Sequence, residues 1–334
     1  MKKEYLPTLL IIILLIFCLI YYYLFFGNDK NDKTQIKVNV VPTLISKLEN
    51  NSIWCSTFQL IWNDLKDEIV KDDVVLLNDE NNQTVLDLNK KTFTTNDISD
   101  KYYYKKYGFM TLDLKHEIEK NIMDKFQEKS DILDSMYFEP NSKNYLLYAM
   151  LYRKFEFNNP FDILDDYNFG INNQSDSILD SNVKVLYYND YNNYAVKIET
   201  KDNDELILIK GKNDKNNFLE IYNELNLINQ SNFLNDDTIS ISNFNFSLIT
   251  NYKELENKII KNTDFVISSA IQTINFDLDN KGGKVKSEAA ITFKNTSVAG
   301  RYFNFTDNYV LFLKEKDKDK PYFAMKIDNI EKFR

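Results

Sequence analysis

The sequence predicts an α+β protein, and three features of the 334-residue chain support that class. Segments of the first half place apolar residues at intervals of three and four, as amphipathic helices do. The second half consists of short β-branched and aromatic runs that Asn, Asp, Gly or Pro interrupt, which is typical of strands and hairpins. No Pro-, Gly- or Ser-rich linker separates the halves, so residues 41–334 are expected to form a single domain.

The chain begins with an apolar segment that is long enough to cross a membrane. Residues 6–26 contain no charged side chain, and a helix of this length crosses a hydrocarbon core of roughly 30 Å. Lys2 and Lys3 precede the segment and favour a cytoplasmic N-terminus. We therefore expect residues 1–27 to be a transmembrane anchor in the cell membrane and residues 28–40 to be a polar stalk. The domain that follows would lie outside the cell, on a single-pass protein.

Two alternatives exist for this N-terminal segment. A cleavable signal peptide would have a shorter apolar run and a small-residue exit, whereas this run ends with Phe25, Phe26 and Gly27. Lipid attachment at Cys18 is less compatible, because the bulky Phe17 precedes it. The only other cysteine is Cys55, so no disulfide is expected within the external domain.

The expected helices and strands follow from periodicity along the chain. The helical period is present in four segments of the first half: residues 44–50, 57–70, 111–138 and 142–157. Strand-like runs occupy seven segments of the second half: residues 183–190, 193–202, 205–211, 238–249, 268–279, 308–317 and 321–327.

Charge and residue chemistry argue against several classes of function. The formal net charge of -9 and the absence of a basic stripe count against nucleic-acid binding. The single histidine, His116, lies among Lys and Glu and is expected to be a solvated helix position, not a general base. One His and two Cys do not supply a zinc site of the usual ligand type, and no cofactor or metal is expected. Cys55 is expected to be a buried apolar side chain, and nucleophilic catalysis would require an activating base that its neighbours do not supply. An enzyme is therefore not expected.

Five stretches of the external domain carry recognisable motifs: residues 50–65, 145–162, 239–259, 267–291 and 303–329. Together, and in this order, they resemble the serpin family. In serpins the first is a strand that leads through Ser into a buried helix, and the second begins with a strand. The third is a strand followed by a helix, which would start after residue 251 here, and the last is the closing hairpin. The resemblance implies a helix-rich first half packed on a large mixed or antiparallel central sheet, together with a smaller β-barrel-like sheet.

The stretch 267–291 resembles the serpin strand that leads into the hinge of the reactive loop. The resemblance implies a loop at about residues 284–301, and the positions that it carries over are the hinge residues Gly283, Ser287, Glu288, Ala289 and Ala290. Insertion of such a hinge as a new strand requires compact side chains on alternate residues. If the protein inhibits a protease, counting from the hinge places the cleaved bond near Ser297, Val298, Ala299 or Gly300. Arg301 is the side chain that a trypsin-like enzyme would prefer.

Two functions from different classes follow. The first is a membrane-anchored serpin-like protein that contacts a protease or other protein through the loop, with protease inhibition as one outcome. Four residues separate Gly283 from Glu288 where the family has one, and Ile291 and Phe293 follow the alanines. These differences count against inhibition. The alternative is a non-inhibitory structural or sensory ectodomain that uses the fold as a scaffold.

Overall fold

The computed structural model describes residues 38–72, 74–78, 82–172, 183–211, 215–225, 230–282 and 300–333. The expected anchor and most of the stalk lie outside the described residues, as do the hinge residues and residues 297–299 of the expected loop. Residues from Val38 onward belong to one compact unit. Of the helices that the structure describes, none combines the length and apolar character that crossing a membrane requires.

The largest element is an eight-stranded mixed sheet. Its spatial order is β1 (Asn39–Val41), β2 (Ser52–Cys55), β18 (Phe323–Ile327), β17 (Tyr309–Glu315), β9 (Asp204–Lys210), β8 (Asn193–Glu199), β7 (Val183–Asp190) and β10 (Ser231–Asn232). All its neighbouring pairs are antiparallel except β1 with β2. The central strands β9 and β17 are buried along almost their whole length, because both faces of the sheet are covered.

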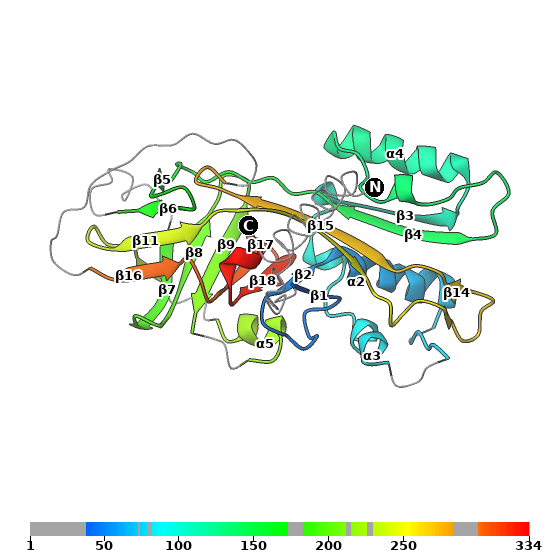
Figure 1. Ribbon diagram of the computed structural model, residues 1–334, viewed down its shortest axis with the longest axis horizontal. Helices are drawn as coiled ribbons and strands as arrows, with labels where there is room; N and C mark the ends of the chain where they lie inside the picture. The colour runs from blue at the N-terminus through cyan, green and yellow to red at the C-terminus, as the bar shows by residue number, and fades with distance from the viewer. Residues whose placement is uncertain are drawn as a thin grey trace, which may run out of the picture. The chain divides into compact units, whose positions relative to one another are not determined.

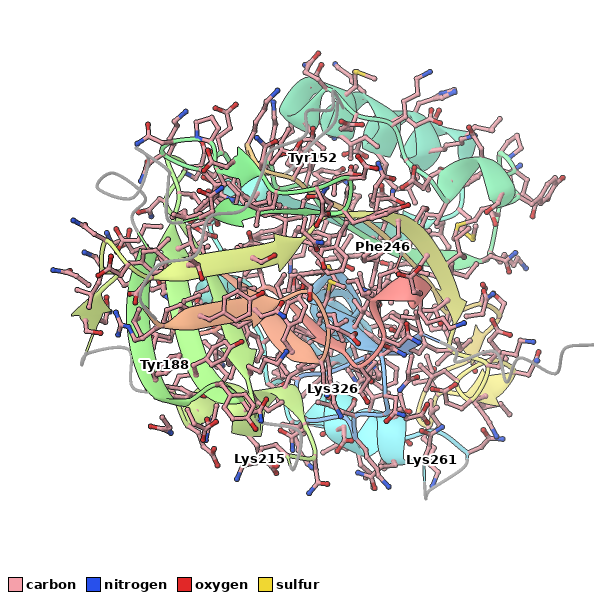
Figure 2. The ribbon with its side chains drawn as sticks, turned by 60° about the vertical axis from the view of Figure 1, so that its left-hand side comes forward. Tyr152, Tyr188, Lys215, Phe246, Lys261 and Lys326 are labelled. Atoms are coloured by element: carbon pink, nitrogen blue, oxygen red, sulfur yellow. The ribbon has the colours of Figure 1, made fainter. Side chains whose placement is uncertain are left out.

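Helix α5 (Phe218–Asn223) covers one face of this sheet, where Phe218 packs on Phe312 with ring centroids 5.9 Å apart. A four-stranded sheet covers the other face, in the order β16 (Tyr302–Phe305), β11 (Thr238–Ser242), β6 (Asn168–Ile171) and β5 (Asp162–Ile163). Figure 2 labels Tyr188 on this side, and its ring lies 5.2 Å from Phe303. Aromatic side chains of the two sheets pack against one another in the core between them, since the ring of Tyr194 lies 5.3 Å from those of Phe303 and Phe305.

Three further strand pairs complete the β structure. They are β3 (Tyr103–Phe109) with β4 (Tyr145–Leu151), β12 (Phe244–Asn251) with β15 (Ile271–Leu278), and β13 (Lys258–Ile259) with β14 (Val266–Ile267). In the view of Figure 1, helix α4 lies above β3 and β4 while α2 lies below them. One face of the pair therefore packs on α4, where Leu146 and Tyr148 are buried, and the other face lies over α2 and is only partly buried.

The helices are short and end at identifiable residues. Helix α2 (Thr57–Asp64) continues as a π-helix (Leu65–Val70), α3 is Gln83–Asn89, and α4 is Leu112–Phe126. The described residues also contain 3₁₀ turns at Thr95–Asp97, Asp100–Tyr102, Leu133–Ser135 and Ile330–Lys332. Thr111 caps α4 by accepting from the Leu114 amide, and Gln127 ends it with a φ of 58°. The expected helix of residues 111–138 therefore stops early, because the left-handed Gln127 turns the chain away.

The strand predictions of the second half are confirmed, since every expected segment contains a strand within a few residues of its bounds. The helix expected at 142–157 is wrong, and β4 stands in its place as the resemblance implied. Its apolar residues contact the α4 cluster on one face and the α2 cluster on the other, so periodicity could not separate strand from helix. Residues 44–50 form turns, and the helix implied after residue 251 is replaced by turns and β13.

Candidate functional site

Strands β4 and β15 face one another across a gap in the β structure. Strand β4 is hydrogen-bonded to β3 and β15 to β12, and among the described residues neither has a strand partner on its other edge. Between them lies a cavity of about 1000 Å³, which β4 lines along its whole length and β15 lines from Ile271 to Asp277. We call this cavity the strand gap. Two unpaired strand edges are a template for an added strand.

Contacts at both ends of the strand gap show that β4 and β15 run in the same direction. Near their N-terminal ends, the rings of Tyr145 and Phe265 lie 5.7 Å apart. Past their C-terminal ends, the amide of Phe157 donates to the carbonyl of Lys281 over 2.9 Å. The chain thus leaves the described structure at Gly282, beside the C-terminal end of the strand gap. A segment that turned back from there would enter antiparallel to both strands.

Helix α2 forms the floor of the strand gap. Its residues Phe58, Trp62 and Leu65 line the cavity and belong to a buried apolar cluster. The helix starts where β2 ends, as the resemblance implied, and Trp62 Nε1 donates to Asn89 Oδ1 over 3.1 Å. This apolar floor suits the inward-facing side chains of an amphipathic strand.

Polar contacts tie each side of the gap to this floor. On the β15 side, Gln272 Nε2 donates to the carbonyl of Cys55 over 3.1 Å and to Thr57 Oγ1 over 2.8 Å. On the β3 side, Lys105 Nζ donates to Asp64 Oδ1 over 2.5 Å. Burial raises the pKa of Asp64 above its ordinary value, although the Lys105 ammonium opposes that rise. Each strand pair is therefore attached to the floor by its own side chains.

A buried ion pair lies where the chain leaves β4. Arg153 Nε donates to Asp204 Oδ2 over 2.6 Å, and Nη2 lies 2.5 Å from the same oxygen in an ion pair. Tyr322 Oη donates to Asp204 Oδ1 over 3.2 Å. The side chains of Arg153 and Asp204 are 4% and 0% exposed. Burial raises the pKa of Asp204 to about 6, since the favourable contacts with Arg153 and Tyr322 only partly offset desolvation. The pair joins the end of β4 to β9 of the large sheet.

The expected loop returns to the described structure at Gly300 and Arg301. A Cβ at Gly300 would lie 1.6 Å from the carbonyl oxygen of Asp236, so no other residue fits there unchanged. The Arg301 guanidinium binds both carboxylate oxygens of Asp237 with Nε and Nη2, and Nη2 also donates to the carbonyl of Asn232. Arg301 is thus fastened beside β11, and its side chain is not presented to a trypsin-like protease in this conformation.

Removing the partner of Arg301 is expected to expose the bond that follows it. Hydrogen bonds to charged groups contribute about 1.5–3 kcal/mol, so Asp237→Ala should raise trypsin cleavage after Arg301 by roughly 10- to 100-fold. The rate is measured by mass spectrometry of the fragments. Asp236→Ala is the matched control, because that neighbouring aspartate is exposed and makes no contact with the guanidinium. Equal rates in both variants would contradict the anchoring role of Asp237.

The other candidate groups of the sequence lie apart from the strand gap or are inert. His116 is exposed on α4, as expected. Cys55 is buried at the floor, and burial raises the pKa of its thiol, which agrees with an apolar role. Among the described residues no group of three or more His, Cys, Asp or Glu side chains is arranged to hold a metal ion.

No protein-family model matches the sequence, and no curated protein matches it either. Solved structures similar to this chain include serpins. Serpin48 of the insect Tenebrio molitor is 12% identical, with 83% of this chain and 74% of that chain covered at a TM-score of 0.42. Human thyroxine-binding globulin complexed with thyroxine is 12% identical over 84% and 74%, also at 0.42. A serpin from the trematode Schistosoma haematobium is 11% identical over 65% and 62%, at 0.37.

Several residues that shape the strand gap carried no signal in the sequence. Arg153 and Asp204 are 51 positions apart, and Gln272 contacts residues more than 200 positions away. Acidic and basic side chains are abundant in this chain, so none of these stood out from its neighbours. Their shared property is burial of a polar group, which only the folded structure reveals.

Proposed function

We propose that the protein is a membrane-anchored, extracytoplasmic serpin-like protein that acts by contact with another protein through residues 284–301. Its partner is a protease or another protein, and the anchor is residues 6–26. The observation that carries the proposal is the strand gap, a position between β4 and β15 that no strand of the described residues occupies and that lies beside Gly282. An added strand there would gain main-chain hydrogen bonds from both unpaired edges.

Protease inhibition is the sharpest form of this proposal. A protease nucleophile would attack the carbonyl of the cut bond, forming an acyl-enzyme with the N-terminal fragment and releasing the new amine on the C-terminal fragment. Entry of the freed hinge segment into the strand gap would then pull on the attached protease and distort the geometry of its active site. The hinge residues Ser287, Ala289 and Ala290 are small enough to enter without overpacking.

Incubation with serine and cysteine proteases tests the proposal. The full-length protein in detergent is expected to be cut within residues 284–301, to form an adduct that survives denaturant, and to melt at a higher temperature once cut. A clean cut without an adduct would remove inhibition. A cut form with no gain in thermal midpoint would remove strand uptake as well.

A non-inhibitory scaffold is the second candidate, and the altered hinge favours it. Ile291 and Phe293 are bulky, whereas a loop that inserts into the sheet has small side chains at these positions. Lys284 and Lys286 also place positive charge beside Gly283. Deleting residues 286–300 separates the two candidates. A scaffold would keep its binding partners after the deletion, and a loop-dependent inhibitor would lose them.

A further inference from the structure

Exposed apolar side chains gather where β3 ends and β14 begins. Phe109 is the last residue of β3 and Val266 is the first residue of β14, and each is 52% exposed. Leu76, Tyr107 and Ile259 are exposed as well, and we call these five residues the apolar patch. Figure 1 shows β14 at the end of the described unit toward which β3 runs. Large apolar side chains grouped on a surface mark sites of interaction with other molecules.

Three side chains of the apolar patch share one face of a small β structure. Ile259 pairs with Val266 across β13 and β14, so both side chains point to the same side. Leu77 bridges to Ile260, and both of these side chains are buried. Because side chains alternate along a strand, the preceding Leu76 points outward, as Ile259 does. This face therefore presents a row of aliphatic side chains to its surroundings.

Aromatic contacts join this row to the end of β3. The ring of Tyr145, at the start of β4, lies 5.7 Å from the ring of Phe265, which precedes Val266. The same ring lies 5.3 Å from Phe109 and 6.4 Å from Tyr107. The apolar patch is therefore one surface that crosses two strand pairs.

The composition of the apolar patch fits the boundary layer of a lipid bilayer. A tyrosine places an apolar ring and a polar hydroxyl there, and a lysine beside apolar residues keeps its ammonium among the headgroups. Lys258 and Lys261, the second of which Figure 2 labels, lie on either side of Ile259 in the chain. Glu256 and Asp264 are also close in the chain. Burial of apolar surface, and not net charge, would therefore supply the attraction to lipid.

The length of chain before the described unit favours lipid over a soluble partner. The proposed anchor ends before residue 28, and the described unit starts at Val38. Residues 28–37 span at most about 36 Å when fully extended. A domain on so short a tether meets the bilayer at a high effective concentration, so a weak contact is sufficient. A soluble protein has no such advantage.

We propose that the apolar patch rests on the lipid bilayer and inserts its side chains at the boundary between headgroups and acyl chains. The inference rests on the anchor of the proposed function, and it adds the surface that orients the domain on the membrane. Strand β16, where the chain returns after residues 284–299, lies at the opposite end of the unit from β14 (Figure 1). Contact through the apolar patch therefore turns the proposed loop away from the bilayer, toward a partner in solution.

Quenching of tryptophan fluorescence by brominated lipid tests this contact. The full-length protein is reconstituted in phosphatidylcholine liposomes, with and without lipid that is brominated near the glycerol end of its acyl chains. Ile259→Trp and Val266→Trp each add a ring that would lie roughly 5–10 Å below the headgroups, so brominated lipid should remove about half of the added emission or more. The natural protein is the blank, because its two tryptophans, Trp54 and Trp62, are buried.

Tyr191→Trp adds the same fluorophore away from the apolar patch. Tyr191 is 74% exposed between β7 and β8, and Figure 1 places these strands at the end of the unit opposite β14. Its added emission should not fall. Equal quenching in all three variants, or none at Ile259→Trp and Val266→Trp, overturns the proposal. A blue shift at these two positions without quenching also overturns it, since protein, such as a second copy, would then cover the patch.

Flotation separates failure of the apolar patch from failure of the anchor. A natural protein that floats with the liposomes after a wash at high pH is anchored, whatever its domain contacts. Flotation without quenching overturns the role of the apolar patch and leaves the anchor in place. A natural protein that does not float lacks the anchor, and the proposed orientation on the membrane is then wrong as well.

Discussion

Replacing Arg153 with leucine is expected to lower the free energy of unfolding by about 3–5 kcal/mol at neutral pH, the range for breaking a buried ion pair. Asp204 would keep its fully buried position but lose the guanidinium that binds it through two nitrogens. The stack of that guanidinium on Tyr102, 3.3 Å from the ring centroid, would also be lost. The measurement is denaturant unfolding of the two proteins under the same detergent conditions.

The effect of this substitution should depend on pH in a defined direction. The pKa of Asp204 is raised to about 6 from an ordinary value of 3.8, so the folded protein binds its proton more tightly than the unfolded chain does. This group therefore contributes stability below about pH 4, and that contribution is lost as the pH rises through about 6. Without Arg153 the pKa of Asp204 rises further, and the loss continues to higher pH. The deficit of Arg153→Leu should therefore be small in acid and grow above about pH 6.

Two control variants make the result specific. Arg153→Lys keeps the positive charge without the two-nitrogen fork, and a smaller loss is expected. Lys106→Leu removes the partner of Glu117 in an exposed pair, where less than about 1 kcal/mol is expected. A pH-independent loss for Arg153→Leu would show that packing, and not the charge on Asp204, accounts for the effect.

Replacing Gln272 with leucine should destabilise the protein by about 2–5 kcal/mol, because several buried polar groups lose their partner together. Gln272 donates to Cys55 and Thr57 beneath the strand gap and accepts from Tyr252 Oη over 2.7 Å. It is 4% exposed, so water cannot replace these bonds. Since this side chain ties β15 to the floor, the substitution should also raise hydrogen exchange along β15 more than along β4.

Thr273→Ser is the control on the same strand. The neighbouring Thr273 alternates to the opposite face and is only partly buried, so a change within about 0.5 kcal/mol is expected. If Gln272→Leu loosened β4 and β15 equally, the tether would stabilise the whole fold and not β15 in particular.

The sequence alone identified much of the fold. Strands β7, β8, β9, β17 and β18 were predicted because each is a short, dense run of apolar and β-branched residues bounded by Asn, Asp, Gly or Pro. The strand-to-helix step from β2 into α2 was found through its motif. Strand β4 was ambiguous, because a strand that packs against α2 on one face and α4 on the other shows no alternation.

The candidate site was only partly accessible to sequence reasoning. The motif of residues 267–291 located the end of β15, and the chain does leave that strand beside the strand gap. Arg301 was expected in the exposed loop, yet its carboxylate partner Asp237 fastens it to the body of the protein. No local sequence pattern indicates that Arg301 pairs with Asp237, because the chain has 50 acidic side chains and the sequence does not distinguish among them.

The sequence by itself determined which segments form the buried strands, because apolar density is a local property of the chain. The tertiary structure decided that β4 and β15 stand apart over an apolar helix, and that Arg153 and Gln272 hold the edges of that gap. Such contacts join residues from about 50 to more than 200 positions apart. Their energies depend on burial and distance, which exist only once the chain has folded.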